Sequence, residues 1–277
     1  ASFNLIKINS SLMCVDTSRF ENIESLMEMM VLCDKKYKYS VAWIDSLHKD
    51  FRGVMTCGNH AEIQALSKNQ QSDPLFYDPK AIASAPPFLP SGLLNKFTVR
   101  AFNEAWYRKA SKEKKNEIQT ISQFFHPLDG VNNWNRIYGK SGFLQYQFVV
   151  PEAAAELVPF TLKKLKNLGA PSFLNVLKRF GPANKSPMSF PIEGWTLAID
   201  LPFKINGLLK LLDDIDHEVI KAGGRIYMAK DIRQNSLNLH RSYPHLNQWK
   251  ETRNHFDSKN IFSSCLASRC KLNLNKN

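Results

Sequence analysis

The sequence predicts an α+β fold, with one broad, largely antiparallel sheet and helices on one of its faces. Several stretches alternate apolar and polar residues with the two-residue period of a strand, whereas fewer show the 3.6-residue period of a helix. The chain has 277 residues, of which 43% are apolar and 22% charged. This is the composition of a folded protein with one large domain or two.

The N-terminal part of the chain is expected to contain two strands, one helix and a long irregular segment. Residues 3–8 and residues 37–43 read as strands. Between them, Asp16-Thr17-Ser18 precedes apolar residues at helical spacing, which predicts a helix capped at 16–18 that includes Ile23 and Met30. Residues 58–100 are rich in proline and have little period, and irregular segments of this length are commonly functional or mobile.

The rest of the chain is expected to combine strands with two helices. We predict strands at 118–125, 143–150, 174–180, 195–201 and 225–230. One helix is expected at 151–168, with a kink or break at Pro159. A second, more regular helix is expected at 207–222, with Gly223 as its stop.

The two-residue period of the strands sorts their side chains into two faces. Strands 143–150 and 195–201 each have one apolar face and one small or polar face, and the latter carries Gln145, Gln147, Thr196, Ala198 and Asp200. Strand 174–180 places Lys178 on a face with apolar residues. A face of this kind fits half of a binding site, and it fits a solvated surface equally well.

The charge of the chain calls for an anionic partner. Lysine and arginine outnumber aspartate and glutamate by 37 to 25, which gives a net charge of +12 with neutral histidines. Such an excess usually reports nucleic acid, an anionic membrane surface or an anionic substrate. Lys163, Lys164 and Lys166 are expected on a helix face that contacts water or a membrane surface. No apolar run approaches the length of a membrane-spanning helix.

Several kinds of site are not indicated by the sequence. It contains no GxGxxG, Walker, GxSxG or HExxH motif, which argues against the common dinucleotide, phosphate, hydrolase and zincin sites. The five cysteines are an odd number at irregular spacing, so we expect reduced thiols. The seven histidines are scattered, and no metal site is expected. Nucleic-acid binding has only the charge in its favour, because no binding motif is recognisable.

A series of short motifs follows in the order Phe125-His126-Pro127-Leu128-Asp129, Trp134-Asn135-Arg136, 142–149, 172–181, Pro187-Met188-Ser189-Phe190-Pro191, 194–200, 222–231, and Tyr243-Pro244 with Trp249. In this order the motifs resemble the decaprenylphosphoryl-β-D-ribose oxidase family of FAD-linked oxidases, which are vanillyl-alcohol-oxidase-like flavoproteins. The resemblance runs nearly end to end from about residue 36.

The resemblance implies an FAD-dependent oxidoreductase that oxidises a sugar hydroxyl. Decaprenylphosphoryl-β-D-ribose 2-oxidation is the expected reaction, and oxidation of an aldonolactone of the D-arabinono-1,4-lactone type is the alternative within the family. Residues 1–9 are expected to end an FAD-binding domain that this chain otherwise lacks. Residues 10–224 are expected to form the substrate-binding domain, and residues 225–277 to pack on the FAD-binding domain. The chain alone is therefore expected to be inactive.

The resemblance also assigns site residues. Lys230 corresponds to a catalytic lysine beside flavin and substrate, and Tyr227 of the same motif is expected at the cofactor. The expected substrate-binding residues are Gln145, Gln147, Lys178, Phe180, Asn175, Val176, Leu174, Thr196, Ala198, Trp43, Phe125 and Leu128. Among these, Lys178 is the candidate for the phosphate or sugar side of the pocket.

The chain departs from the family pattern at five positions. Ala198, Thr196 and Phe125 stand where the family member targeted by covalent inhibitors has cysteine, asparagine and tyrosine. Ala198 cannot form a thiolate adduct, although hydride transfer does not require one. Cys265 and Ser268 replace an aspartate and an arginine that are usual in the family, which affects the expected docking of the tail on the flavin domain.

The partners implied are a lipid-linked sugar phosphate or a sugar lactone, the missing FAD domain, a reductase that completes an epimerisation, and a peripheral membrane contact. The expected location is the cytoplasm, at the inner face of the membrane where the contact forms. No nucleic acid is expected. Outside the family, the residues leave open a basic domain that binds RNA or anionic lipid and catalyses nothing.

Overall fold

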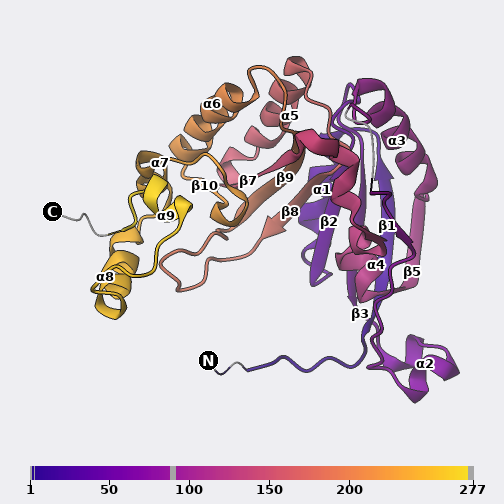
Figure 1. Cartoon of the computed structure of the whole chain (residues 1–277). Helices are drawn as coiled ribbons and strands as arrows, with labels where there is room; N and C mark the ends of the chain where they lie inside the picture. Colours follow the sequence, from indigo (N-terminus) through magenta and orange to yellow (C-terminus); the bar gives the residue numbers. More distant parts are fainter. Residues whose placement is uncertain (1, 3, 88–91, 274–277) are drawn as a thin grey trace. The chain divides into compact units, whose positions relative to one another are not determined.

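The computed structural model describes residue 2, residues 4–87 and residues 92–273. The chain divides into two compact units, Ala1–Gly142 and Phe143–Asn277. Each unit contains an antiparallel sheet with helices, as Figure 1 shows. The predicted α+β class with largely antiparallel strands is therefore confirmed.

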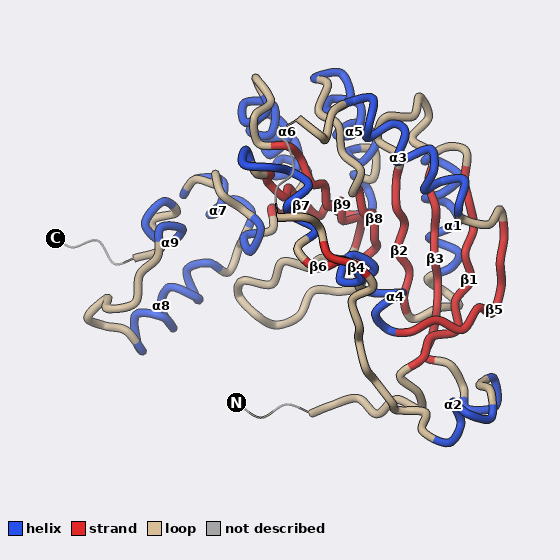
Figure 2. The backbone as a smooth tube through the Cα atoms, turned by 45° about the vertical axis from the view of Figure 1, so that its right-hand side comes forward, coloured by secondary structure: helices blue, strands red, loops and turns tan. Residues whose placement is uncertain are grey.

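Unit 1 contains a sheet of four strands in the order β2 (Tyr39–Ile44), β3 (Gly53–His60), β1 (Leu12–Phe20) and β5 (Glu113–Thr120). Figure 2 shows these strands side by side, and each neighbouring pair is antiparallel. The side chains of Met13 and Val15 on the central strand β1 are fully buried. A short parallel pair joins β4 (Ala83–Ser84) to β6 (Val131–Asn132).

The helices of unit 1 are α1 (Ile23–Cys33), α2 (Lys68–Ser72), α3 (Lys96–Lys109) and α4 (Ile121–Phe125), with 3₁₀ turns η1 (Ile63–Ala65), η2 (Pro127–Gly130) and η3 (Trp134–Ser141). Helix α1 is capped by Asn22, whose side chain accepts a hydrogen bond from the Ser25 backbone N–H. The cap predicted at 16–18 is wrong, because these residues continue strand β1 and pair with β3.

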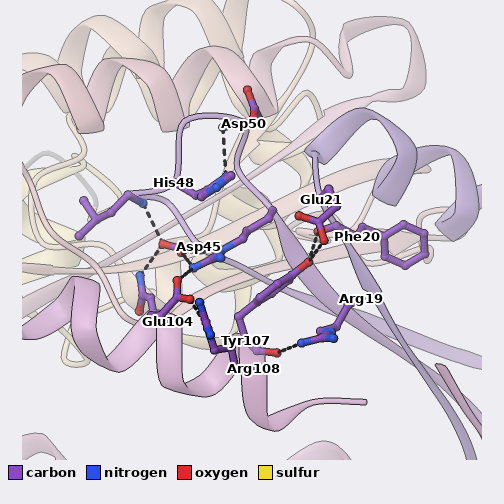
Figure 3. A network of polar contacts seen from close by, with 12 residues as sticks. Arg19, Phe20, Glu21, Asp45, His48, Asp50, Glu104, Tyr107 and Arg108 are labelled. Carbon is purple, nitrogen blue, oxygen red and sulfur yellow. Dashed lines mark hydrogen bonds and ion pairs between the residues drawn. The ribbon is translucent and has the colours of Figure 1, made fainter. Parts of the chain in front are cut away.

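Helix α3 is fixed to unit 1 by a buried polar network, shown in Figure 3. Asp45 is 3% exposed and accepts hydrogen bonds from Arg52 Nε and Nη2, both at 3.1 Å, and from Asn103 Nδ2 at 2.8 Å. Arg52 also pairs with Glu104 and lies over the ring of Tyr107, 4.3 Å from its centroid. Charged and polar side chains therefore hold a helix that the sequence analysis did not predict.

Unit 2 contains a sheet in the order β10 (Arg225–Ile226), β7 (Phe143–Pro151), β9 (Gly194–Pro202) and β8 (Asn175–Phe180). Helices α5 (Leu157–Leu168) and α6 (Leu208–Lys221) cover one face of it, as Figure 1 shows. Phe148 and Leu197 of the sheet and Leu212 and Val219 of α6 are fully buried. The core of unit 2 thus lies between these helices and the apolar face of the sheet.

The last part of unit 2 forms a separate small core. Helices α7 (Ser236–Ser242), α8 (Leu246–Phe256) and α9 (Cys265–Arg269) follow the 3₁₀ turn η5 (Met228–Lys230). Their buried residues include Leu239, Tyr243, Leu246, Cys270 and Leu272. Another 3₁₀ turn, η4 (Glu152–Ala154), precedes α5. No helix among the described residues is both long enough and apolar enough to cross a bilayer.

Several predicted elements differ from the structure. The strand predicted at 118–125 is wrong in its bounds, because β5 ends at Thr120 and this residue caps α4. The strand predicted at 225–230 ends at Ile226. Pro159 does not kink a helix, since α5 begins at Leu157 and the proline occupies its first turn, where the backbone N–H lacks a helical partner in any case.

The strand predicted at 3–8 belongs to no sheet over its described residues 4–8. Leu5 and Ile6 are 89% and 77% exposed. Residue 3 lies outside the described residues. The segment has a strand-like sequence and apolar side chains that nothing in the described structure covers.

We predict that Asp45→Ala lowers the free energy of unfolding by about 2 kcal/mol, because it removes a buried acceptor from the Asn103 amide and from the Arg52 guanidinium, which keeps its pair with Glu104. Urea unfolding of the whole chain, followed by circular dichroism, measures the change. Asp50→Ala is the matched control, since Asp50 lies on the surface and its pair with Lys49 spans 3.8 Å. Equal losses in the two variants would contradict the structural role given to Asp45.

Candidate functional site

A pocket opens in unit 2 beside strands β7 and β10. Its lining includes Gln145, Gln147, Tyr227 and Lys230. These four residues are all predicted site residues. The backbone N–H of Tyr227 donates to the carbonyl oxygen of Gln147 at 2.9 Å, which joins the turn carrying Lys230 to strand β7.

The cross-strand register places further predicted residues on the face of the sheet that carries the two glutamines. Gln147 and Val176 both lie opposite Ala198, on β7 and β8 respectively. In the same register, Gln145 lies opposite Asp200 and Lys178 lies opposite Thr196. On the other face, the Tyr146 hydroxyl donates to Asp216 of α6 at 2.8 Å. The glutamine-bearing face is therefore the one turned away from α6.

The two glutamines are held by hydrogen bonds to strand β9. Gln145 Nε2 donates to Asp200 Oδ1 at 2.8 Å, and Gln147 Nε2 donates to Thr196 Oγ1 at 3.0 Å. Asp200 is 3% exposed, and its second oxygen, Oδ2, has no hydrogen-bond partner among the described residues. An acidic oxygen that is buried and unpaired is costly, and such groups concentrate at functional sites.

Three ionisable side chains on this side of the sheet influence one another. Burial raises the pKa of Asp200 to about 6, against the lowering effects of the Gln145 hydrogen bond and the charge of Lys230. The pKa of Lys230 is lowered by burial and raised in part by Asp200. Lys178 reaches solvent, yet the loss of surrounding water lowers its pKa, and the positive charge of Lys230 lowers it further.

A buried network fixes the pocket wall that follows Lys230. Asp216 is fully buried and receives hydrogen bonds from Tyr146 and Gln234 and an ion pair from Arg233 at 2.7 Å. Burial raises the pKa of Asp216 to about 6, although Arg233 and the hydrogen bonds act in the opposite direction. Arg233 also lines the pocket, so this network connects helix α6 to the site.

Aromatic rings connect Phe180 to the pocket. Phe180 and Phe190 meet edge to face with ring centroids 5.8 Å apart, and Phe190 and Tyr227 lie 4.5 Å apart. Phe190 and Asp200 are not among the site residues predicted from the sequence. Strand alternation places Asp200 on the face of Gln145 and Gln147, but the sequence does not show that its carboxyl is buried. Phe190 lies between strands, where no periodicity applies.

Four predicted site residues do not lie on the pocket face of unit 2: one is on the opposite face of its sheet, and three belong to unit 1. Asn175 pairs with Ile199, so it lies on the helix-covered face, fully buried, where its Nδ2 donates to the Ser172 carbonyl oxygen at 3.2 Å. The structure therefore does not bring Asn175 to the pocket face. Trp43, Phe125 and Leu128 belong to unit 1, and their substrate contact stays a prediction.

The remaining predicted positions have simple surroundings. Leu174 is half-buried, and its carbonyl oxygen accepts the backbone N–H of Asp200 at 3.1 Å. Phe125 packs against Tyr39, with ring centroids 4.9 Å apart, beside the core of unit 1.

The five cysteines are free thiols. In the described parts of the chain, no three side chains of histidine, cysteine, aspartate or glutamate gather as a metal site would require.

No protein-family model matches the chain. The chain is 41% identical over 242 residues to the decaprenylphosphoryl-β-D-ribose oxidase of Mycolicibacterium smegmatis, and the match covers 86% of this chain and 52% of that protein. It is 28% identical over 284 residues to an uncharacterized protein of the mprA 5′ region of Streptomyces coelicolor, covering 98% of this chain and 76% of that protein. The resemblance predicted from the motifs is confirmed, and the chain spans about half the length of the first relative.

Among solved structures, 6-hydroxy-D-nicotine oxidase of Arthrobacter nicotinovorans matches with a TM-score of 0.43 at 10% identity. The match covers 90% of this chain and 53% of that one. A likeness of this degree carries no argument about fold or function.

We predict that Lys230→Gln raises the pKa of Lys178, because it removes the neighbouring positive charge that disfavours the Lys178 ammonium. Titration of ¹³C-methylated lysines by NMR measures this pKa. Lys163→Gln removes an equal charge from the exposed face of α5 and is expected to leave the pKa of Lys178 unchanged. An unchanged Lys178 pKa in Lys230→Gln would mean that the two lysines do not share a site.

Proposed function

We propose, from its similarity to decaprenylphosphoryl-β-D-ribose oxidase, that this chain is the substrate-binding part of an FAD-dependent oxidoreductase that oxidises a hydroxyl of a lipid-linked ribose phosphate. The observation that carries the proposal is the 41% identity over 86% of the chain. That relative is named for an oxidase activity on decaprenylphosphoryl-β-D-ribose, and the proposal extends the activity to the polypeptide that carries this chain.

The side chains that line the pocket of unit 2 have the chemistry that such a reaction needs. Its amide side chains, Gln145 and Gln147, are suited to the hydroxyl groups of a sugar. Lys230 presents a cationic amine at the same pocket, and the buried Asp200 carboxyl lies within electrostatic reach of it. These groups can bind a polyol, hold it in one orientation and keep a proton at the Lys230 amine or the Asp200 carboxyl.

The cofactor that fits this site is FAD. Acceptance of a hydride from the substrate carbon is the chemistry that FAD supplies when bound. Lys230 and Tyr227 are the residues proposed to contact it, since both line the pocket and belong to the motif that the family places beside the flavin. The Lys230 amine would favour negative charge on the flavin. The ring of Tyr227, which packs against Phe190, would offer a flat surface to it.

Exposed apolar side chains support a further domain that packs on this chain. Leu5 and Ile6 lie in an unpaired strand-like segment, within the stretch proposed to end the FAD-binding domain. In the proposed C-terminal docking segment 225–277, Phe256, Ile261 and Phe262 are 83%, 72% and 78% exposed. Arg253 and Asp257 hold the backbone of this exposed tip by hydrogen bonds, which is expected of a surface built to be covered.

The charge of the chain suits an anionic, lipid-linked substrate. Lys178 and Lys230 lie close enough for the charge of Lys230 to lower the pKa of Lys178, and a phosphate between or beside them relieves that repulsion.

Lys163 and Lys164 on the exposed face of α5 are proposed to contact the inner membrane surface, where each contributes about 1 kcal/mol. A reductase completing an epimerisation is a proposed partner. No observation favours the aldonolactone or RNA-binding alternatives.

The test is Lys230→Ala in the complete polypeptide. We expect substrate-driven flavin bleaching, followed by anaerobic stopped-flow absorbance, to slow by about 10²-fold or more, because a general acid-base group contributes at least that much. Lys163→Ala is the control and should bleach at the wild-type rate. A wild-type rate in Lys230→Ala removes this lysine from the mechanism, and the absence of bleaching by any sugar alcohol refutes the proposed function.

A further inference from the structure

We propose that Asp200 fixes the side-chain amide of Gln145 with its carbonyl oxygen toward the pocket, so that this position accepts a hydrogen bond from a ligand hydroxyl and disfavours a carbonyl. The inference deepens the proposed function and rests on it for the identity of the ligand. The orientation of the amide depends only on groups of this chain.

The orientation follows from the chemistry of the two partners. A glutamine amide has one end that donates and one that accepts, whereas an ionised carboxylate only accepts. Gln145 lies directly opposite Asp200 in the strand register, and its nitrogen lies 2.8 Å from Asp200 Oδ1. While Asp200 is ionised, the nitrogen must face it. The oxygen of Gln145 is then the end left for the pocket that this residue lines.

Gln147 provides a contrast within the same pocket. Its Nε2 donates to Thr196 Oγ1, but a hydroxyl can also donate, so Thr196 accepts either end of the amide. The amide of Gln147 is therefore free to match a donor or an acceptor. Of the two glutamines, Gln145 is the one whose orientation is dictated by an acceptor-only neighbour, so it discriminates an alcohol from a ketone where Gln147 does not.

Discrimination of this kind suits an alcohol oxidation. The oxidation converts a C–OH group, which donates a hydrogen bond, into a C=O group, which only accepts. A hydroxyl placed at Gln145 is bound through its O–H, and the corresponding carbonyl would face the amide oxygen with no hydrogen between them. The alcohol is thus favoured over the ketone at this position, because the ketone has no O–H to donate and leaves the amide oxygen of Gln145 unpaired.

The protonation of Asp200 governs the arrangement. Its Oδ2 is buried without a partner among the described residues, and burial raises the pKa to about 6. Protonated Asp200 can donate, and the Gln145 amide can then turn its oxygen toward it. Lys230 is the charged group that acts on Asp200, and it also acts on Lys178. The other charged groups that line the pocket are paired, Asp231 with Arg269 and Arg233 with Asp213 and Asp216.

The test follows the side-chain amide of Gln145 by NMR in the complete polypeptide labelled with ¹⁵N-glutamine. Gln145→Ala identifies the resonances by their disappearance. In the wild type, we expect the amide resonances to shift with pH around a midpoint of about 6. Asp200→Asn should abolish the midpoint, while the control Asp214→Asn, which removes an equal charge from the exposed face of α6, should keep it.

A second measurement uses the steady-state oxidation of decaprenylphosphoryl-β-D-ribose. Asp200→Asn is expected to raise KM by about tenfold, the value of one hydrogen bond, with a smaller change in kcat. A flat pH profile for wild-type Gln145, a midpoint that survives in Asp200→Asn, or an unchanged KM would each overturn the inference. If the polypeptide oxidises no sugar alcohol, the proposed function fails, and the wild-type titration still decides the orientation of the amide.

Discussion

The structure around the pocket depends on the burial of one carboxylate, that of Asp216. A buried carboxylate without donors costs several kcal/mol, so the segments that supply donors are held where they can reach it. Tyr146 supplies a hydroxyl from the sheet, and Arg233 and Gln234 supply N–H groups from the segment after η5. Helix α6, strand β7 and the pocket wall are thereby joined at a single point. The position of Lys230, just before this segment, is a consequence of the same requirement.

The elements that could be predicted from the sequence are those whose apolar side faces a helix layer. Strands β7 and β9 alternate cleanly because one side packs under α5 and α6, and α6 has one apolar stripe for the same reason. Strand β5 has no such pattern, because its side chains are mostly exposed. Helix α3 was missed for a different reason. Its buried face consists of Val99, Asn103 and Tyr107, and the polar Asn103 in the middle of that face interrupts the apolar period.

The site was partly predictable because a two-residue period survives in the sequence. It groups Gln145 with Gln147, and Thr196 with Ala198, and the cross-strand register then joins both pairs to Lys178. The period shows which face a side chain is on but not how deeply it is buried, so the burial of Asp200 and its unpaired oxygen are known only from the structure. The same period separates Asn175 from Val176, and the resemblance had assigned both to one site. Adjacent strand residues point to opposite faces, and only Val176 is on the face of the glutamines.

The pocket wall is also fastened from far along the chain. Arg269 of α9 donates to the carbonyl oxygens of Gln234 and Ile232 at 2.8 and 2.6 Å and pairs with Asp231 at 2.6 Å. During synthesis on the ribosome, strands β7, β8 and β9 therefore emerge well before the residue that secures the wall beside them. The nascent pocket stays unfinished until α9 has left the exit tunnel. A shortened product that stops before Arg269 would keep its sheet and lose the ordered edge of its site.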